Sequence, residues 1–65
     1  MNTGEIIKKI RTEQKMSQSE LAKLCGLSQQ HISKIENNKI EPHLDTVILI
    51  LRNLHYDIKI EAIKL

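Results

Sequence analysis

Residues 18–37 read QSELAKLCGLSQQHISKIEN, and this stretch decides the fold of the chain. Its apolar residues recur at helical spacing in two groups, which are Leu21, Ala22, Leu24 and Cys25, and then Leu27, Ile32 and Ile35. Gly26 lies between the groups and can adopt the left-handed backbone conformation that would strain a residue with a Cβ atom. The pattern predicts two short amphipathic helices separated by a tight turn.

Both expected helices carry a start signal. Ser17 precedes the first apolar group and Glu20 follows three residues later, which is the spacing of a capping box. Ser28 can cap the second helix in the same way. Ala22 is small where the second helix would cross the first, so the two helices can approach closely. We expect helices from about residue 18 to 25 and from about 29 to 37.

The same residues carry a family resemblance. The pattern of Leu21, Ala22, Gly26, Leu27, Ile32 and Ile35 is similar to the helix-turn-helix of the lambda-repressor-like (Cro/XRE) family. The run SQQHISKIENNK at 28–39 resembles the recognition helix of lambdoid phage repressors. The similarity extends from Arg11 to about Leu54 and implies a small all-α domain of about four helices that binds DNA. A helical hairpin used only for packing is the alternative.

The outward side of the second motif helix is the expected base-reading surface. Ile32 and Ile35 face the core, so the polar residues between them face outward. A glutamine amide both donates and accepts, which suits adenine N6 and N7, and a lysine suits guanine. The resemblance implies base contacts by Gln29, Gln30 and Lys34. His31 and Ser33 are further base-contact candidates, with a plain surface role as the alternative.

Phosphate contacts are expected around this helix. The resemblance assigns them to Gln18, Asn37 and Arg11, and Lys39 is a further candidate. Family members pair an arginine at the position of Arg11 with a glutamate at the position of Glu36, which would hold the guanidinium toward DNA and tie the first helix to the recognition helix. Ala22, Gly26 and Glu36 are expected to be structural.

Two more helices complete the expected domain. Thr3 can cap a first helix with an apolar side, and Pro42 fixes the entry to a fourth helix from about His43 to Leu54. Many relatives have glycine at the position of Asn38, a residue that also tolerates the left-handed conformation. The fourth helix has more apolar residues than one core-facing side needs. Ile48, Leu49 or Leu51 would then either be buried in the same subunit or meet a second one.

The end of the chain departs from the phage repressors, which continue with another helix. Residues 56–62 alternate between apolar and charged side chains, which predicts a β-strand. A lone strand leaves its backbone groups unpaired, so we expect an antiparallel ribbon between two copies of the chain. Ile58, Ile60 and Ala62 would make the dimer contacts, as in HipB- and HigA-type antitoxins, which this end resembles. A disordered tail is the alternative.

Length and charge agree with this organisation. The chain has 65 residues, a net charge of +2 and a single cysteine, so we expect one small core, no internal disulfide and a buried Cys25. We expect residues 1–55 to form the DNA-binding domain and residues 56–65 the dimerisation strand. Residues 1–40 carry seven Lys and Arg against four Glu, as a phosphate-facing half requires.

Catalysis and metal binding are not expected. The histidines, at 31, 43 and 55, lack the spacing of a helical metal site, and no nucleophile stands in a recognisable catalytic arrangement. We therefore predict a non-enzyme without cofactors. No stretch has the apolar length of a signal peptide or of a membrane span, so we expect a cytoplasmic, nucleoid-associated protein without membrane contact.

The resulting prediction is a homodimeric, sequence-specific transcriptional repressor of a near-palindromic double-stranded operator. The terminal strand favours an antitoxin that also binds a toxin protein and represses its own operon. The alternatives are a stand-alone repressor of the phage or restriction-modification controller type, and a protein-interaction module that does not bind DNA.

Overall fold

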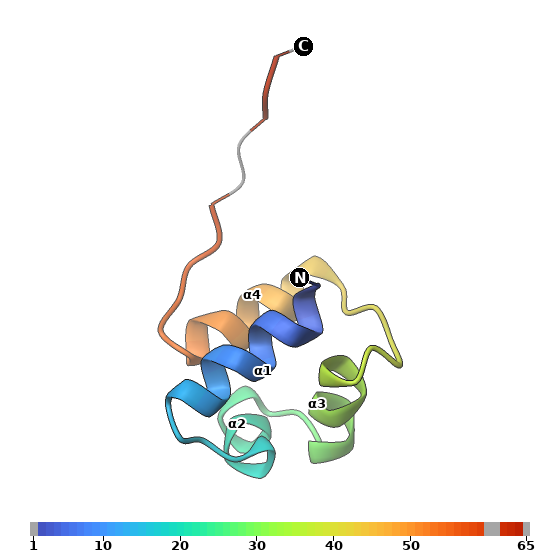
Figure 1. Cartoon of the computed structure of the whole chain (residues 1–65), viewed down its shortest axis with the longest axis vertical. Helices are drawn as coiled ribbons and strands as arrows, with labels where there is room; N and C mark the ends of the chain where they lie inside the picture. Colours follow the sequence, from blue (N-terminus) through green and yellow to red (C-terminus); the bar gives the residue numbers. More distant parts are fainter. Residues whose placement is uncertain (1, 60–61, 65) are drawn as a thin grey trace.

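Four helices make up the body of the molecule. The computed structural model describes residues 2–59 and 62–64, and it contains α1 (Thr3–Glu13), α2 (Gln18–Cys25), α3 (Gln29–Glu36) and α4 (Leu44–Asn53). The helices α1 and α4 lie side by side, and α2 and α3 pack together against them (Figure 1). The predicted domain of about four helices is therefore present, and helices are the only regular elements of the described residues.

The helix starts follow local capping, with one correction. The Ser17 hydroxyl accepts from the Glu20 amide and the Glu20 carboxylate accepts from the Ser17 amide, both at 3.0 Å, so the predicted capping box is confirmed. Ser28 caps α3 by accepting from the His31 amide at 3.1 Å. The prediction that Thr3 caps α1 is wrong. Asn2 takes that place because its backbone is extended and its side chain accepts from the Glu5 amide at 3.0 Å.

Left-handed residues follow all four helices, and the sequence analysis predicted two of them, whereas Lys15 after α1 and His55 after α4 were not predicted. Gly26 has φ +69° and ends α2. Asn38 has φ +59°, which turns the chain so that the Lys39 amide donates to the Lys34 carbonyl oxygen at 2.8 Å. Two predicted helices are slightly shorter than expected, because Asn37 is the C-cap of α3, and His43 and Leu54 are the caps of α4.

A close approach joins α1 to the end of α3. Gly4 is buried, and a Cβ atom built on it would lie 2.2 Å from the Ile35 carbonyl oxygen. The same atom would lie 2.9 Å from the Asn38 side-chain oxygen. Only a glycine lets the two helices come this near, so Gly4 sets the distance between α1 and α3.

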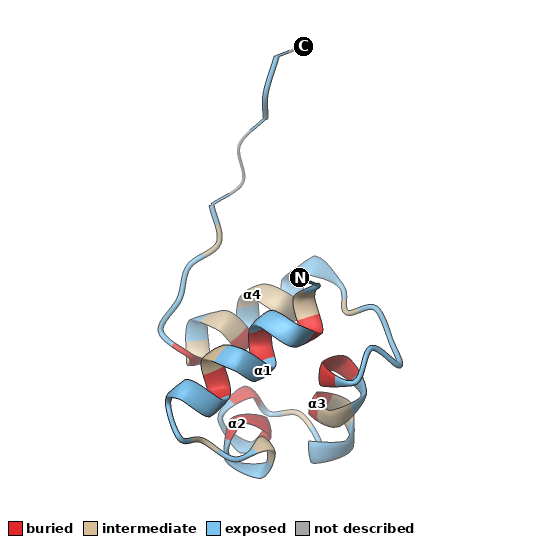
Figure 2. Ribbon diagram, viewed as in Figure 1, coloured by how far each residue is buried: buried red, intermediate tan, exposed pale blue. Residues whose placement is uncertain are grey.

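The core lies where the four helices meet (Figure 2). Its buried apolar residues are Ile7, Leu21, Ala22, Cys25, Ile32, Ile35, Ile50 and Leu54. The ends of α1 and α4 are also joined by a hydrogen bond, because the Gln14 side-chain amide donates to the Leu54 carbonyl oxygen at 2.7 Å. The two buried apolar residues of α3, Ile32 and Ile35, fix which of its sides faces outward.

The described part of the tail contains no strand. Residues 56–59 lead away from the helical body without joining a sheet (Figure 1), and residues 62–64 are also outside any strand. Ile58 is half-buried and Ala62 is exposed, while Ile60 lies outside the described residues. The expected strand is thus not found in the single chain, where these residues have no second strand to complete a ladder.

Within residues 2–59 and 62–64, no helix is long and apolar enough to cross a bilayer. The same residues hold no group of three or more His, Cys, Asp or Glu side chains that could bind a metal ion.

Candidate nucleic-acid interface

The outward side of α3 is polar and uncovered. Gln29, Gln30 and Lys34 are exposed, and His31 and Ser33 are half-buried. The two glutamines occupy the first turn of the helix, directly after the Ser28 cap. A side of α3 that carries amide and ammonium groups but no acidic side chain is therefore available to a ligand.

The last turn of α3 is braced on its polar side. The Asn37 side-chain amide donates to the Ser33 hydroxyl at 3.2 Å. Asn37 and Lys39 are both exposed, and the Lys39 amide is held by the Lys34 carbonyl oxygen. The polar side of α3 therefore continues without a break into the loop that follows it.

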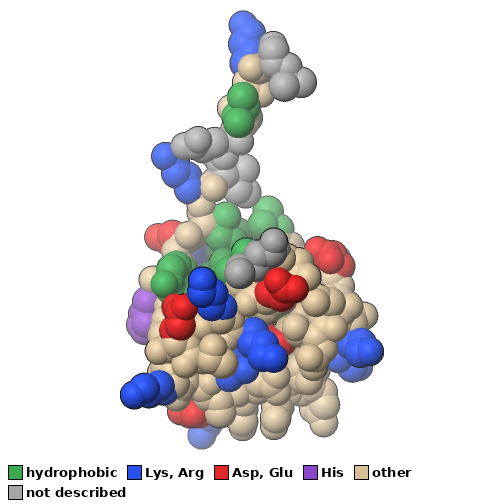
Figure 3. All heavy atoms as spheres, in the orientation of Figure 1, with side chains coloured by type: hydrophobic (Ala, Val, Ile, Leu, Met, Phe, Trp, Pro, Cys, Tyr) green, Lys and Arg blue, Asp and Glu red, His purple; other side chains and the backbone are tan. Residues whose placement is uncertain are grey.

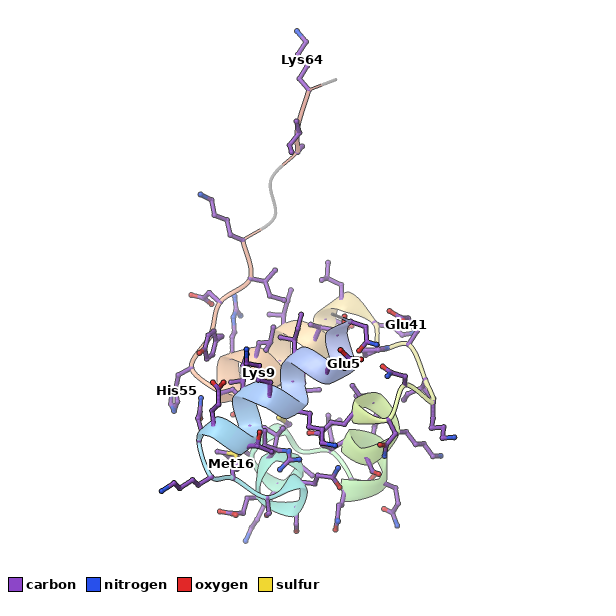
Figure 4. All side chains as sticks on the ribbon, in the orientation of Figure 1. Glu5, Lys9, Met16, Glu41, His55 and Lys64 are labelled. Atoms are coloured by element: carbon purple, nitrogen blue, oxygen red, sulfur yellow. The ribbon has the colours of Figure 1, made fainter. Side chains whose placement is uncertain are left out.

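A buried ion pair fixes α3 against α1. The Arg11 Nε and Nη2 atoms donate to the two carboxylate oxygens of Glu36 at 2.6 and 2.9 Å. The Arg11 Nη1 atom donates to the Met16 carbonyl oxygen at 2.6 Å. Met16 lies in the turn before α2 (Figure 4). The side chains of Arg11 and Glu36 are only 10% and 1% exposed. Two parallel hydrogen bonds fix the relative orientation of the two side chains, so the pair also fixes α1 relative to α3.

Glu36 also holds α2. The Gln18 side-chain amide donates to the Glu36 Oε1 atom at 3.0 Å, and Gln18 is half-buried at the start of α2. One carboxylate therefore accepts hydrogen bonds from two other helices. Among the described residues, no buried side-chain nitrogen or oxygen atom is left without a partner.

The net effect of this environment is to stabilise the charged form of Glu36. Burial by itself raises the pKa of the carboxyl group. The hydrogen bonds from Arg11 and Gln18 and the charges of Arg11 and Lys8 lower it by more, so the pKa of Glu36 lies below its ordinary value. The carboxylate is thus charged at neutral pH despite its burial.

The structure places some of these residues as the sequence predicts and others differently. The expected pair of Arg11 with Glu36 is confirmed, but the pair is inside the protein, so the guanidinium does not stand at the surface where a phosphate would reach it freely. The side chain of Gln18, an expected phosphate contact, is partly committed to Glu36. Ala22 and Gly26 have the expected structural places in the core and at the end of α2.

Two features of the site were missed by the sequence analysis. The first is Gly4, whose position inside the first turn of a helix was a usable signal because glycine is a poor helix former. The second is the bond between Gln18 and Glu36, which depends on the crossing of α2 and α3 and has no local signal.

Charged and apolar side chains occupy different parts of the visible surface. Lys and Arg side chains are spread over the helical body, whereas hydrophobic side chains gather where the tail leaves it (Figure 3). The exposed large apolar residues of the described chain include Ile6, Leu44, Leu49 and Tyr56, and Leu44 is 54% exposed. These residues come mainly from α1, α4 and the tail, not from α3.

Comparison with known proteins gives one family and several relatives. A helix-turn-helix family model matches residues 7–60. The chain is 44% identical over 55 residues to the uncharacterised HTH-type transcriptional regulator y4dL of Sinorhizobium fredii. The aligned region covers 85% of this chain and 28% of that protein. No solved structure matches the chain significantly.

Two relatives come from one bacteriophage, Bacillus phage phi105. Its immunity repressor protein is 38% identical over 47 residues, covering 72% of this chain and 33% of the repressor. The 10 kDa protein of its ImmF control region is 39% identical over 57 residues, covering 85% of this chain and 63% of that protein. The chain therefore spans less than two thirds of the length of each of these relatives.

Proposed function

The chain belongs to the helix-turn-helix family, and from this premise we propose that it is a sequence-specific DNA-binding regulator of transcription. The observation that carries the proposal is the uncovered polar side of α3, which is backed by buried Ile32 and Ile35 and anchored by the Arg11–Glu36 pair. A rigidly held helix of this kind suits the major groove of B-DNA, which is wide enough to admit it.

The base contacts come from the first part of α3. Gln29 and Gln30 have exposed amides, which can engage the N6 and N7 atoms of adenine. Lys34 lies one turn further and suits guanine or a phosphate. His31 and Ser33 are half-buried, and Ser33 already accepts a hydrogen bond from Asn37, so these two stand second as base contacts.

The phosphate contacts come from the edges of the motif. Asn37 and Lys39 are exposed at the end of α3, and the Gln18 amide nitrogen keeps a second N–H group besides the one bonded to Glu36. We assign Arg11 mainly to the support of α3, because its guanidinium is almost fully buried.

A homodimer would place two copies of α3 in successive major grooves about 34 Å apart, so the operator would be a near-palindrome. The exposed apolar residues of α4 and the tail supply a surface that a second copy could bury. In the dimer, the tails would pair as an antiparallel ribbon through Ile58, Ile60 and Ala62.

Repression is the mode of action we favour, because one relative is named an immunity repressor and another is named for the ImmF control region of the same phage. This favours a stand-alone repressor. An antitoxin that binds a toxin and represses its own operon remains the second candidate. The feature of the sequence that favours it is the strand predicted at residues 56–62.

A binding titration tests the proposal. The full chain is titrated against the DNA upstream of its own gene at two salt concentrations, with unrelated DNA of equal length as the control. We expect tighter binding to the upstream DNA and a steep loss of affinity as salt rises. Equal affinity for both DNAs, or no binding to either, would overturn it. Repeating the titration with the product of the neighbouring gene separates the two candidates. That product should strengthen DNA binding by an antitoxin and should have no effect on a stand-alone repressor.

A further inference from the structure

One side of α1 faces the C-terminal end of α3. Gly4, Lys8 and Arg11 are spaced four and three residues apart, so they share that side of the helix. Gly4 lies against the Ile35 carbonyl oxygen, and Arg11 binds the Glu36 carboxylate. Lys8 therefore lies between two direct contacts with the last turn of α3.

Lys8 differs from its two neighbours in exposure. Gly4 and Arg11 are buried, whereas Lys8 is exposed, and no hydrogen bond or ion pair joins its ammonium group to a described residue. Its positive charge still acts on Glu36. Burial raises the pKa of that carboxyl and the hydrogen bonds from Arg11 and Gln18 lower it, and the charges of Arg11 and Lys8 lower it further. Lys8 thus stands beside the Glu36 site with its ammonium free for a ligand.

A candidate phosphate contact also binds Glu36. Gln18 donates to the Glu36 Oε1 atom, so Gln18 and Lys8 both act on the same carboxylate. Asn37 directly follows Glu36, and both Asn37 and Lys39 are exposed. A phosphate backbone that runs past Gln18 and the end of α3 would pass close to Lys8.

We propose that Lys8 is a DNA phosphate contact supplied by α1, outside the two helices of the helix-turn-helix. The inference rests on the proposed DNA binding and extends its phosphate-facing surface by one helix. The competing explanation is structural: an ammonium beside the Glu36 carboxylate and the negative end of α3 would stabilise the fold without touching DNA.

The test compares two substitutions that remove the same charge from the same helix, Lys8→Gln and Lys9→Gln. Lys9 is the next residue of α1 (Figure 4) and points about 100° away around the helix, so it leaves the side that faces α3. Affinity for the upstream DNA is measured over a range of salt concentrations for both variants, for the unaltered chain and for Lys8→Arg. Thermal unfolding of each protein is followed by circular dichroism.

For Lys8→Gln we expect each bound subunit to lose about five- to tenfold in affinity near 0.1 M salt and about 0.9 in log–log salt slope, because it neutralises one fewer phosphate. For the proposed dimer the slope should therefore fall by about 1.8. Lys8→Arg and Lys9→Gln should keep the slope of the unaltered chain. An unchanged slope in Lys8→Gln overturns the inference, whether or not the melting temperature falls. So does an equal loss in the two Gln variants, which would report overall charge alone. If the unaltered chain binds no DNA, the proposed function fails together with the inference. If the unaltered chain binds DNA but Lys8→Gln keeps its salt slope, only the inference about Lys8 fails.

Discussion

At the level of single residues, the Glu36 carboxylate connects three helices. It receives Arg11 from α1 and Gln18 from α2, and it is itself part of the last turn of α3. Breaking a buried pair by removing one partner leaves an uncompensated charge, which costs about 3–5 kcal/mol in general. The orientation of α3 therefore depends on a charge that is almost fully enclosed.

This dependence predicts acid sensitivity. Although burial raises the pKa of Glu36, its hydrogen bonds and neighbouring positive charges bring the folded-state pKa below the unfolded value of about 4.3. The stability that Glu36 contributes is then fully present above about pH 4.3 and is lost as the pH falls through the folded-state pKa. Thermal unfolding measured from neutral pH downward should show this loss.

The control for acid sensitivity is Glu36→Gln, which should unfold at lower temperature near neutral pH and lose less stability on acidification. Some loss will remain, because the capping carboxylate of Glu20 also has a lowered pKa, owing to its hydrogen bonds with Ser17. An NMR titration of the Glu36 carboxyl in the unaltered chain provides a second readout. A Glu36 pKa at or above about 4.3 would contradict the prediction.

Residues that act through local chemistry were predictable from the sequence. Ser17, Ser28 and Gly26 work through backbone groups a few positions away, so their roles could be read directly. The roles of Gly4 and Gln18 arise where two helices cross, and no short stretch of sequence encodes that contact. The pairing of Arg11 with Glu36 was predicted from family resemblance, but its degree of burial was not.

At the level of elements, α3 has one side that packs in the core and one side that is open to a ligand. Its apolar side sets its orientation through the core, and its polar side remains for a ligand. The existence of the helices at 18–25 and 29–36 followed from apolar periodicity and caps, with one residue of error at the end of α3. The strand at 56–62 could not be settled in the same way, because a strand requires a partner that a single chain does not supply.

The division of α3 predicts different effects for two glutamines. Replacing Gln30 with Ala should cost about 1–3 kcal/mol of discrimination at one base pair and leave nonspecific binding unchanged. Replacing Gln18 with Ala should weaken all DNA sequences to a similar extent, since it removes a phosphate contact and the Glu36 bond. Competition titrations with singly substituted operators measure both effects. Unchanged base preference in Gln30→Ala would place the recognition surface elsewhere.

At the level of the whole molecule, a small core is accompanied by apolar surface. Only eight apolar residues among the described ones form the buried core, while Leu44, Leu49 and Tyr56 are exposed. Chains of this length bury only about 60% of the surface of the unfolded chain, so further burial against a second copy would add stability.

The dimer prediction has a matched pair of variants. Successive side chains of a strand point to opposite sides, so Ile58 would lie with Ile60 and Ala62, and Ile63 on the other side. Sedimentation of the unaltered chain should give a dimer, and Ile58→Glu should weaken it much more than Ile63→Glu. A monomer at all concentrations, or equal effects of the two substitutions, would argue against the ribbon.

The hydrogen bond from Gln14 to the Leu54 carbonyl oxygen joins residues that lie 40 positions apart, at the ends of α1 and α4. The helices themselves begin from contacts within one turn, and helix formation takes about a microsecond or less. The slow event in folding should then be the return of α4 to α1, which closes the 40 positions between Gln14 and Leu54 into one loop. That loop closure costs entropy that rises only with the logarithm of its length, so we expect this domain to fold in milliseconds or faster.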